Sequence, residues 1–157
     1  MQPKIVTLTE KKVVGMQSKM LMHQYENIIK LWESFMPKKH ELKNTINQEL
    51  IAIQDYPDFG NLETSYNIWA CVEVSNLSTV PSDMKGFTIP KGEYIKVLHK
   101  GMDAGKTYQR IMTEWLPNSG YTIDDRPHFQ VMGDKYKNGS PDSEEDFYIP
   151  VKNVLNE

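Results

Sequence analysis

Two stretches of the chain carry apolar residues at helical spacing. In each stretch, apolar side chains recur three or four residues apart, which is typical of a helix that packs one face on a core. These stretches are residues 23–36 and 104–116. Pro37 follows the first and Pro117 follows the second. Because proline cannot continue the hydrogen-bond ladder, the pattern predicts two helices that each end at a proline.

The other regular segments are short and rich in β-branched and aromatic residues, which is typical of strands. The predicted strands are residues 4–8, 12–16, 49–54, 66–74, 93–99, 128–132 and 147–151. Clusters of glycine, proline, asparagine and serine separate many of them, as expected for turns. The chain is therefore predicted to be an α+β protein.

The predicted elements come twice in the same order, strand, helix, strand, strand. The first set fills about residues 4–76 and the second about residues 88–153. The two helices superimpose at an offset of 80 residues, which also aligns the two prolines. We interpret the chain as two β-α-β-β repeats related by a pseudo-two-fold axis, with a shared antiparallel sheet and the helices packed on it. This predicts a single domain over residues 1–157.

Two repeats that share a sheet are expected to leave a groove where they meet, and ligands favour such concave seams. One face of the later strands carries aromatic, sulfur-containing and polar side chains. We predict that these line the groove as ligand-binding residues: Trp69, Cys71, Glu73, Gln130, Met132 and Tyr148. Aromatic rings, a soft thioether and a few polar anchors suit flat, partly apolar molecules. A packing role for each residue is the alternative, with Glu73 as a solvated charge.

Composition narrows the classes of partner and compartment. The net charge is −3 and no basic stripe is present, which argues against direct nucleic-acid binding. Cys71 is the only cysteine, so no intramolecular disulfide can form, as is usual in a reducing compartment. The sequence has neither a signal-peptide pattern nor an apolar run long enough to span a membrane. We therefore expect a cytoplasmic protein without membrane contact.

Catalytic and cofactor motifs are weak. Residues 101–107 resemble a phosphate-binding loop, but three residues rather than four separate the glycines. A helix capped by Asp103 is the simpler interpretation. The histidines lack metal-ligand spacing, and no nucleophile elbow is present. The sequence thus predicts no catalytic residues, no cofactor and no metal.

Several segments resemble a known family. They read GEYIKVLHKG, IMTEWLPNSGY, DDRPHFQVMGDKY and EEDFYIPVK, with weaker agreement at VVGMQ, LWESFMP and NIWACVEV. Together they resemble the GyrI-like family, the effector-binding domain of multidrug-sensing and AraC-type transcription regulators. The resemblance implies a double β-α-β-β fold with a ligand cleft on the pseudo-two-fold. It also implies a free-standing form, because the repeats leave no room for the DNA-binding segment of those regulators.

One departure from the family pattern bears on ligand choice. Drug-sensing members carry a glutamate in an F-E-V-Y strand, whereas residues 129–132 here read Phe-Gln-Val-Met. This predicts a weakened preference for cations and tolerance of neutral amphipathic ligands, with Glu73 as a substitute charge. Tyr148 matches the family's cleft tyrosine.

The resemblance implies a protein that binds small amphipathic or drug-like molecules, and we expect a binding protein rather than an enzyme. Two alternatives stay open. One is a protein-interaction module that acts on a regulator or a topoisomerase, such as a DNA gyrase modulator. The other is a hydrolase of cyclopropane-containing compounds, which the missing cleft glutamate disfavours.

Overall fold

The computed structural model describes residues 2–137 and 139–154. The described residues form nine strands, two α-helices and three shorter helical turns. The strands are β1 (Lys4–Leu8), β2 (Lys11–Met20), β3 (Leu50–Asp55), β4 (Tyr66–Glu73), β5 (Lys85–Ile89), β6 (Gly92–Lys100), β7 (Tyr121–Ile123), β8 (His128–Met132) and β9 (Glu144–Asn153). The helices are α1 (Glu26–Phe35) and α2 (Ala104–Arg110), and the turns are η1 (Met36–Glu41), η2 (Ile111–Trp115) and η3 (Leu116–Asn118).

The seven predicted strands and both helices are present, so the α+β class is confirmed. Both α-helices run on into helical turns that contain the prolines, η1 with Pro37 and η3 with Pro117. Asp103 stands at the N-terminal cap of α2 but makes no side-chain cap hydrogen bond, so the predicted cap is wrong. Its carboxylate instead lies 3.4 Å from the Lys106 ammonium. Strands β5 and β7 were missed because both are short and sit beside turn residues.

The strands form one antiparallel sheet in the order β1-β6-β9-β8-β3-β4-β2-β5, with β7 added to β9. The two repeats meet where β3 pairs with β8. At the centre of this pairing Ala52 lies opposite Gln130, flanked by the pairs Ile51 with Val131 and Ile53 with Phe129. Ala52 and Gln130 are equivalent positions of the two repeats, so the pseudo-two-fold axis passes between them. The predicted duplication is confirmed.

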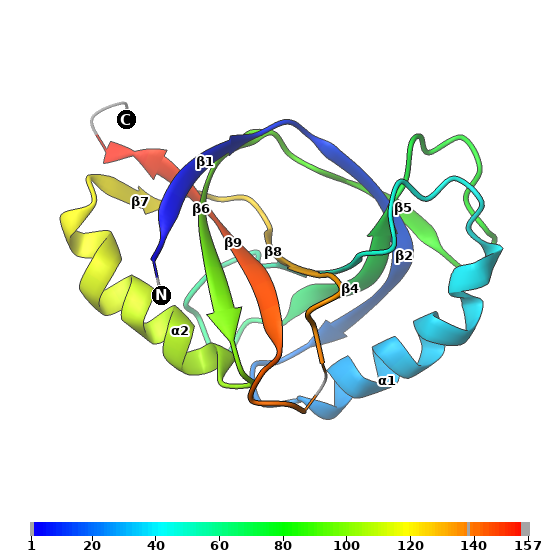
Figure 1. Ribbon diagram of the computed structural model, residues 1–157, viewed down its shortest axis with the longest axis horizontal. Coiled ribbons are helices and arrows are strands. Elements are labelled where there is room, and N and C mark those ends of the chain that lie inside the picture. The colour runs from blue at the N-terminus through cyan, green and yellow to red at the C-terminus, as the bar shows by residue number, and fades with distance from the viewer. Residues whose placement is uncertain (1, 138, 155–157) are drawn as a thin grey trace.

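The strand that begins each repeat region pairs with the other repeat. β1 lies on β6 of the second repeat, and β5 lies on β2 of the first. Both pairings keep one register, from Lys4 opposite Lys96 to Gly15 opposite Lys85. The β1–β2 segment and the β5–β6 segment therefore form one long two-stranded ribbon that crosses the axis. In Figure 1 this ribbon arches over the top of the molecule from one half to the other.

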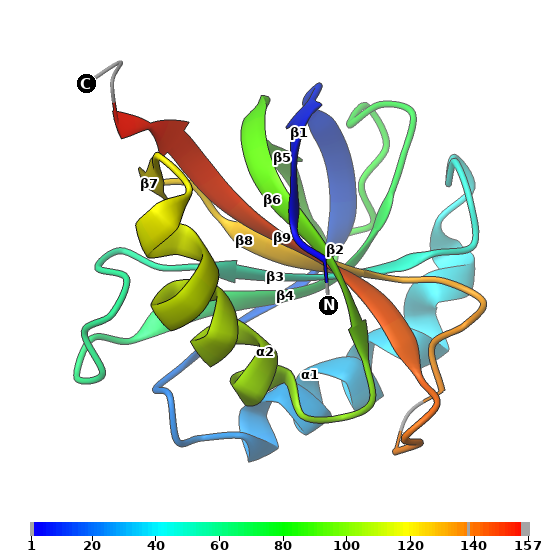
Figure 2. The same cartoon turned by 60° about the vertical axis from the view of Figure 1, so that its left-hand side comes forward.

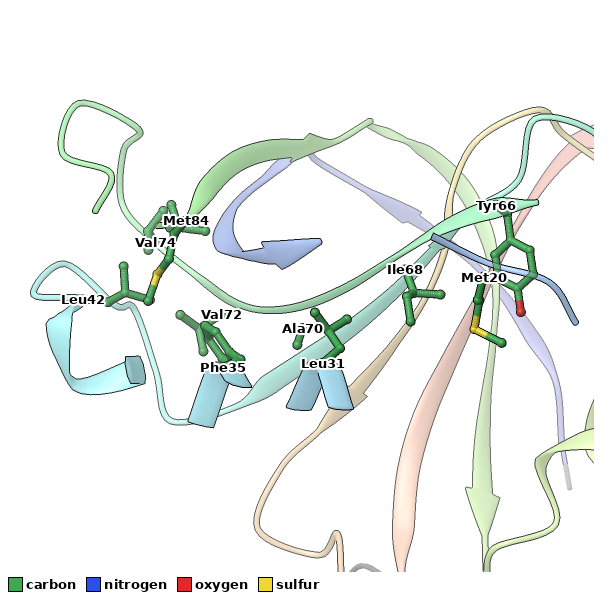
Figure 3. Close-up of a cluster of buried hydrophobic side chains, with 11 residues drawn as sticks. Met20, Leu31, Phe35, Leu42, Tyr66, Ile68, Ala70, Val72, Val74 and Met84 are labelled. Atoms are coloured by element: carbon green, nitrogen blue, oxygen red, sulfur yellow. The ribbon is translucent and has the colours of Figure 1, made fainter. Parts of the chain in front are cut away.

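Both helices lie on the same side of the sheet, one on each half (Figures 1 and 2). Under α1, Leu31 and Phe35 pack on Ala70 and Val72 of β4, as Figure 3 shows. Under α2 and η2, Ile111 packs with side chains of β6 and β9. Each helix thus covers its own apolar cluster on the convex side of the sheet.

A third apolar cluster fills the opposite, enclosed side of the sheet. It draws side chains from β2, β3, β4, β5, β6, β8 and β9, with Val6 and Leu8 of β1 packed against it. Phe129 and Tyr148 stack with ring centroids 4.6 Å apart, and Tyr94 meets both rings edge-on. We call this cluster, which the ribbon closes over, the barrel interior.

Gly15 marks the closest approach of β2 to β4. A Cβ atom at this position would lie 2.6 Å from the Cα of Cys71 and would overlap the carbonyl oxygen of Ala70. These are backbone atoms of a central strand, so they cannot move aside. We expect Gly15→Ala to lower the free energy of unfolding by about 3 kcal/mol or more, as measured by urea denaturation.

Gly105 offers the matched control. It lies in α2, and a Cβ there would meet no atom within 4 Å. Gly105→Ala should raise the unfolding free energy by about 0.5–1 kcal/mol, since alanine loses less conformational entropy in a helix. Equal effects of the two substitutions would contradict this account of β2 packing.

Candidate functional site

The six sequence-predicted site residues lie on both sides of the sheet. In an antiparallel ladder, directly opposite residues point to the same side. Trp69 lies opposite Ile53, which lies opposite Phe129, which in turn lies opposite Tyr148. Trp69, Cys71, Glu73 and Tyr148 therefore share the side of the barrel interior.

Gln130 and Met132 point to the other side. Gln130 lies opposite Phe147, which belongs to the cluster under α2. The predicted common face is therefore wrong for Gln130 and Met132. The error came from assigning Phe129 and Val131 to the helix-covered core, when both belong with the barrel interior.

The barrel-side residues are tightly packed. Cys71 is fully buried, and its thiol donates to the carbonyl oxygen of Ile51 at 3.4 Å. Burial raises the pKa of Cys71, so the thiol stays protonated. The Trp69 side chain is buried, and its indole N–H has no hydrogen-bond partner in the described chain. Glu73 lies nearer the rim, where its carboxylate is 3.5 Å from the Lys11 ammonium.

On the helix side, the strands at the pseudo-two-fold carry a row of mixed side chains that we call the seam. Its members are Leu50, Ala52 and Gln54 of β3 with His128, Gln130 and Met132 of β8. The seam lies between the cluster under α1 and the cluster under α2. The three β3 members remain partly exposed although both helices lie on this side. Solvent therefore reaches the floor between the helices.

The orientation of each helix shows which of its residues face the seam. On α1, the Asn27 amide donates to the carbonyl oxygen of Lys19 on β2, the strand remote from the seam. On α2, Thr107 likewise bonds His99 of β6, the remote strand of the other half. Residues on the opposite flank of each helix must then face the seam.

On α2 this seam-facing flank holds Tyr108 and Met112, both partly buried. At the N-cap and along α1, Tyr25, Ile28, Ile29 and Trp32 recur at helical spacing, and Trp32 packs against the cluster under α1. Tyr25 is 63% exposed and Ile29 is 59% exposed. Tyr25 and Ile29 therefore leave apolar surface exposed to solvent on the helix-bearing side of the sheet.

A pair of amides joins the two repeats across the seam. Gln54 Nε2 donates to Gln130 Oε1 at 2.7 Å, and Gln130 Nε2 donates back to Gln54 Oε1 at 2.8 Å. Gln130 Nε2 also lies 3.5 Å from the hydroxyl of Tyr108. Burial raises the pKa of Tyr108, which keeps its hydroxyl protonated. The floor therefore offers uncharged donors and acceptors.

One end of the seam opens into a pocket of about 370 Å³. Its inner wall is His128, whose ring stacks on Phe59 at 4.6 Å and meets Tyr56 edge-on at 5.1 Å. Burial lowers the pKa of His128 to about 3, so the imidazole is neutral. Its Nδ1 atom is buried without a hydrogen-bond partner among the described residues. The rim carries Asp58, Asp124, Asp125 and Arg126, with Asp124 and Arg126 paired at 2.9 Å.

The other end of the seam reaches Glu145. Strand register places this residue opposite His99, and it lines a second pocket of about 340 Å³. Burial raises the pKa of Glu145 to about 7. His99 is buried and stacks on Phe147 at 4.9 Å, and its Nε2 atom has no partner in the described chain. The sequence carries no signal for Glu145, because it is one of several consecutive acidic residues in a segment that resembles a solvated loop.

Two further observations concern the described residues as a whole. No three histidine, cysteine, aspartate or glutamate side chains within them come together as ligands for a metal ion. No helix formed by them is long and apolar enough to cross a membrane.

The raised pKa of Glu145 makes a prediction about stability. An ordinary glutamate ionises near pH 4.5, so between pH 4.5 and 7 the folded chain holds a proton that the unfolded chain releases. Stability from this group is therefore lost as the pH rises. We expect the wild type to lose about 1–2 kcal/mol more than Glu145→Gln between pH 4 and pH 8, a figure reduced because water screens the partly exposed carboxyl. Urea denaturation at both pH values measures it.

Glu144→Gln is the control for this measurement. Glu144 is the chain neighbour of Glu145, points to the other side of β9 and lies 3.7 Å from the Lys135 ammonium. It should follow the wild-type pH dependence. A Glu145→Gln variant that also follows it would show that Glu145 is not desolvated.

Comparison with known proteins identifies the fold and the family. The family model described as Cass2, integron-associated effector binding protein, matches residues 4–151. The transcriptional regulator BrlR of Pseudomonas aeruginosa is 27% identical over 133 residues, which cover 80% of this chain and 47% of BrlR. The chain thus spans about half the length of that regulator.

Solved structures share the fold. SAV2435, in a structure bound to tetraphenylphosphonium, superimposes with a TM-score of 0.73 at 14% identity and covers 100% of this chain and 98% of its own. The C-terminal domain of EcmrR gives 0.68 at 18% identity, with 98% of each chain covered. An integron cassette protein of Vibrio cholerae gives 0.65 at 12% identity, covering 96% of this chain and 95% of its own.

The match over nearly the whole described length confirms the resemblance seen in the sequence. The chain belongs to the Cass2 family of integron-associated effector-binding proteins, and it is an effector-binding domain related to those of transcription regulators.

Proposed function

We propose that the chain binds small amphipathic molecules at the seam between its two repeats. The observation that carries this proposal is the amide pair of the partly exposed Gln54 and the buried Gln130, on the side of the sheet where α1 leaves apolar side chains exposed. A polar floor beside an open apolar wall is the usual composition of a small-molecule site.

The energetics of the seam support a binding role. Polar side chains between two apolar clusters cost free energy unless they are hydrogen-bonded, and aliphatic residues would fuse the clusters without that cost. The exposed stripe on α1 likewise leaves apolar surface in water, and a ligand would cover it. The exposed stripe is unfavourable in the empty protein, whereas the hydrogen-bonded amides of the seam are already satisfied and offer an amphipathic guest polar partners.

The relatives support the same proposal. SAV2435, which shares the fold, was solved with tetraphenylphosphonium, a molecule with four phenyl groups. The kinship with transcription regulators suggests that ligand occupancy serves as a signal. A protein partner that receives this signal, such as a regulator or a topoisomerase, remains a prediction.

We propose that the chain is a single binding domain, and that it acts in the cytoplasm, because its lone cysteine is free and buried. The two repeats together form the site. The limits given to them and to the domain remain predictions, and Met1 and residues 155–157 lie outside the described part. Gln130 and Met132 belong to the proposed site. Ligand contact by Trp69, Cys71, Glu73 and Tyr148 would require a second site in the barrel interior and remains a prediction.

Isothermal titration calorimetry tests the proposal with tetraphenylphosphonium and the neutral triphenylphosphine oxide as probes. At least one probe should bind saturably to the wild type. Tyr108→Ala and Gln130→Ala should each weaken binding about tenfold, because each removes a seam contact. Circular dichroism melting of each variant confirms that it is folded.

Trp69→Phe and Glu73→Gln are the controls, since both residues lie on the barrel side. They should bind the probes as the wild type does. Weakening by these two variants alone would move the site to the barrel interior. Absence of binding by both probes would overturn the proposal.

A further inference from the structure

The amide pair of the seam has a definite chemical preference. Each glutamine presents one N–H and one carbonyl oxygen to the other, at 2.7 and 2.8 Å. A primary amide has two donor hydrogens and two acceptor lone pairs, so each side chain keeps one of each beyond the pair. The second donor of Gln130 is directed to Tyr108, at 3.5 Å. Gln54 is partly exposed, and its remaining donor and acceptor are free of other side chains in the described chain.

The groups around this pair are uncharged. His128 is neutral because burial lowers its pKa to about 3, and Tyr108 stays protonated. The carboxylates of the adjoining pocket lie at its rim, and Asp124 is already paired with Arg126. Glu145, at the far end of the seam, holds its proton below about pH 7, so under those conditions a cation on the seam floor finds dipoles but no opposite charge.

The rings beside the pair favour a flat guest. His128 is near-parallel to Tyr108, with an interplanar angle of 25° and centroids 6.2 Å apart. On the pocket side, His128 is near-parallel to Phe59, at 27°. Aromatic faces in such arrangements favour planar molecules that stack in an offset manner.

A guest that enters between the glutamines must replace the hydrogen bonds it breaks. A molecule without a matching donor and acceptor leaves amide groups unpaired, which disfavours its binding strongly. A lactam carries N–H and C=O side by side and presents the same edge that each glutamine now presents to the other. It can form this reciprocal pair with one glutamine, and the second lone pair of its carbonyl can accept from the other.

We propose that the seam selects neutral, planar aromatic lactams and carboxamides, read by Gln54 and Gln130 through their donor and acceptor edges. This rests on the proposed function, because it names the ligand class of the same site. The selectivity thus comes from one side chain of β3, in the first repeat, and one of β8, the equivalent strand of the second repeat.

Three bicyclic probes of one size test the inference by calorimetry. Quinolin-2(1H)-one carries the lactam edge, 1-methylquinolin-2-one lacks its N–H, and N-methylquinolinium is a cation without the edge. The lactam should bind the wild type at least about tenfold more tightly than either of the others, because only it offers the amides a donor and an acceptor on one edge. This rank order needs no variant.

Gln130→Glu and Gln54→Glu then change the chemistry with little change of shape. Each places a carboxylate on the seam floor, and each should favour N-methylquinolinium over the lactam, reversing the wild-type order. Gln17→Glu is the control. Gln17 lies opposite Trp69 on the barrel side and accepts from Lys85, so this variant should keep the wild-type order.

Equal binding of the lactam and its N-methyl analogue, or tighter binding of the cation to the wild type, would overturn the inference while leaving the proposed function intact. If none of the three probes, tetraphenylphosphonium or triphenylphosphine oxide binds, the proposed function fails as well. A lactam preference that survives both glutamine substitutions would place recognition elsewhere and overturn the assignment to Gln54 and Gln130.

Discussion

The ladder between the β1–β2 and β5–β6 segments is the constraint on which the architecture depends. It runs in one register across the pseudo-two-fold, so each repeat is held partly by a strand from the other. The sheet is thereby bent around the barrel interior, and its two ends become parts of one ribbon (Figure 1). Neither repeat can open without breaking hydrogen bonds in the other half. The close approach of β2 to β4 at Gly15 tightens the same region.

This closure gives the two sides of the sheet different packing. The enclosed side is filled by Trp69, Tyr94, Phe129 and Tyr148, whose rings contact one another or neighbouring rings. The convex side carries the helices, which stand apart over separate clusters. Between the helices the seam keeps polar side chains such as Gln54 within reach of solvent. The enclosed side is already packed, and for this reason we propose the seam as the ligand site.

The duplication also explains the chemistry of the seam. At a two-fold, equivalent strands run antiparallel, and side chains near the axis face counterparts from the other repeat. Gln54 and Gln130 use this proximity to form a reciprocal pair that a charged residue on one side alone could not form. Buried neighbours such as His128 remain neutral in this environment, and Glu145 holds its proton to about pH 7. Burial thus favours the uncharged forms of the titratable groups along the seam.

The sequence by itself determined the local structure and the duplication. Helical spacing, the two prolines and the paired apolar positions at equivalent offsets are properties of neighbouring residues, so they could be read without coordinates. The family resemblance followed from the same segments. Only the tertiary structure decided which side of the sheet each strand residue faces. Alternation shows which residues of one strand share a face, but it does not show which face of that strand matches which face of the neighbouring strand. For this reason Gln130 and Met132 were placed beside Trp69 when they lie across the sheet from it. The strand exchange, the amide pair and the burial of Glu145 all depend on contacts between residues far apart in the chain, and no local pattern records them.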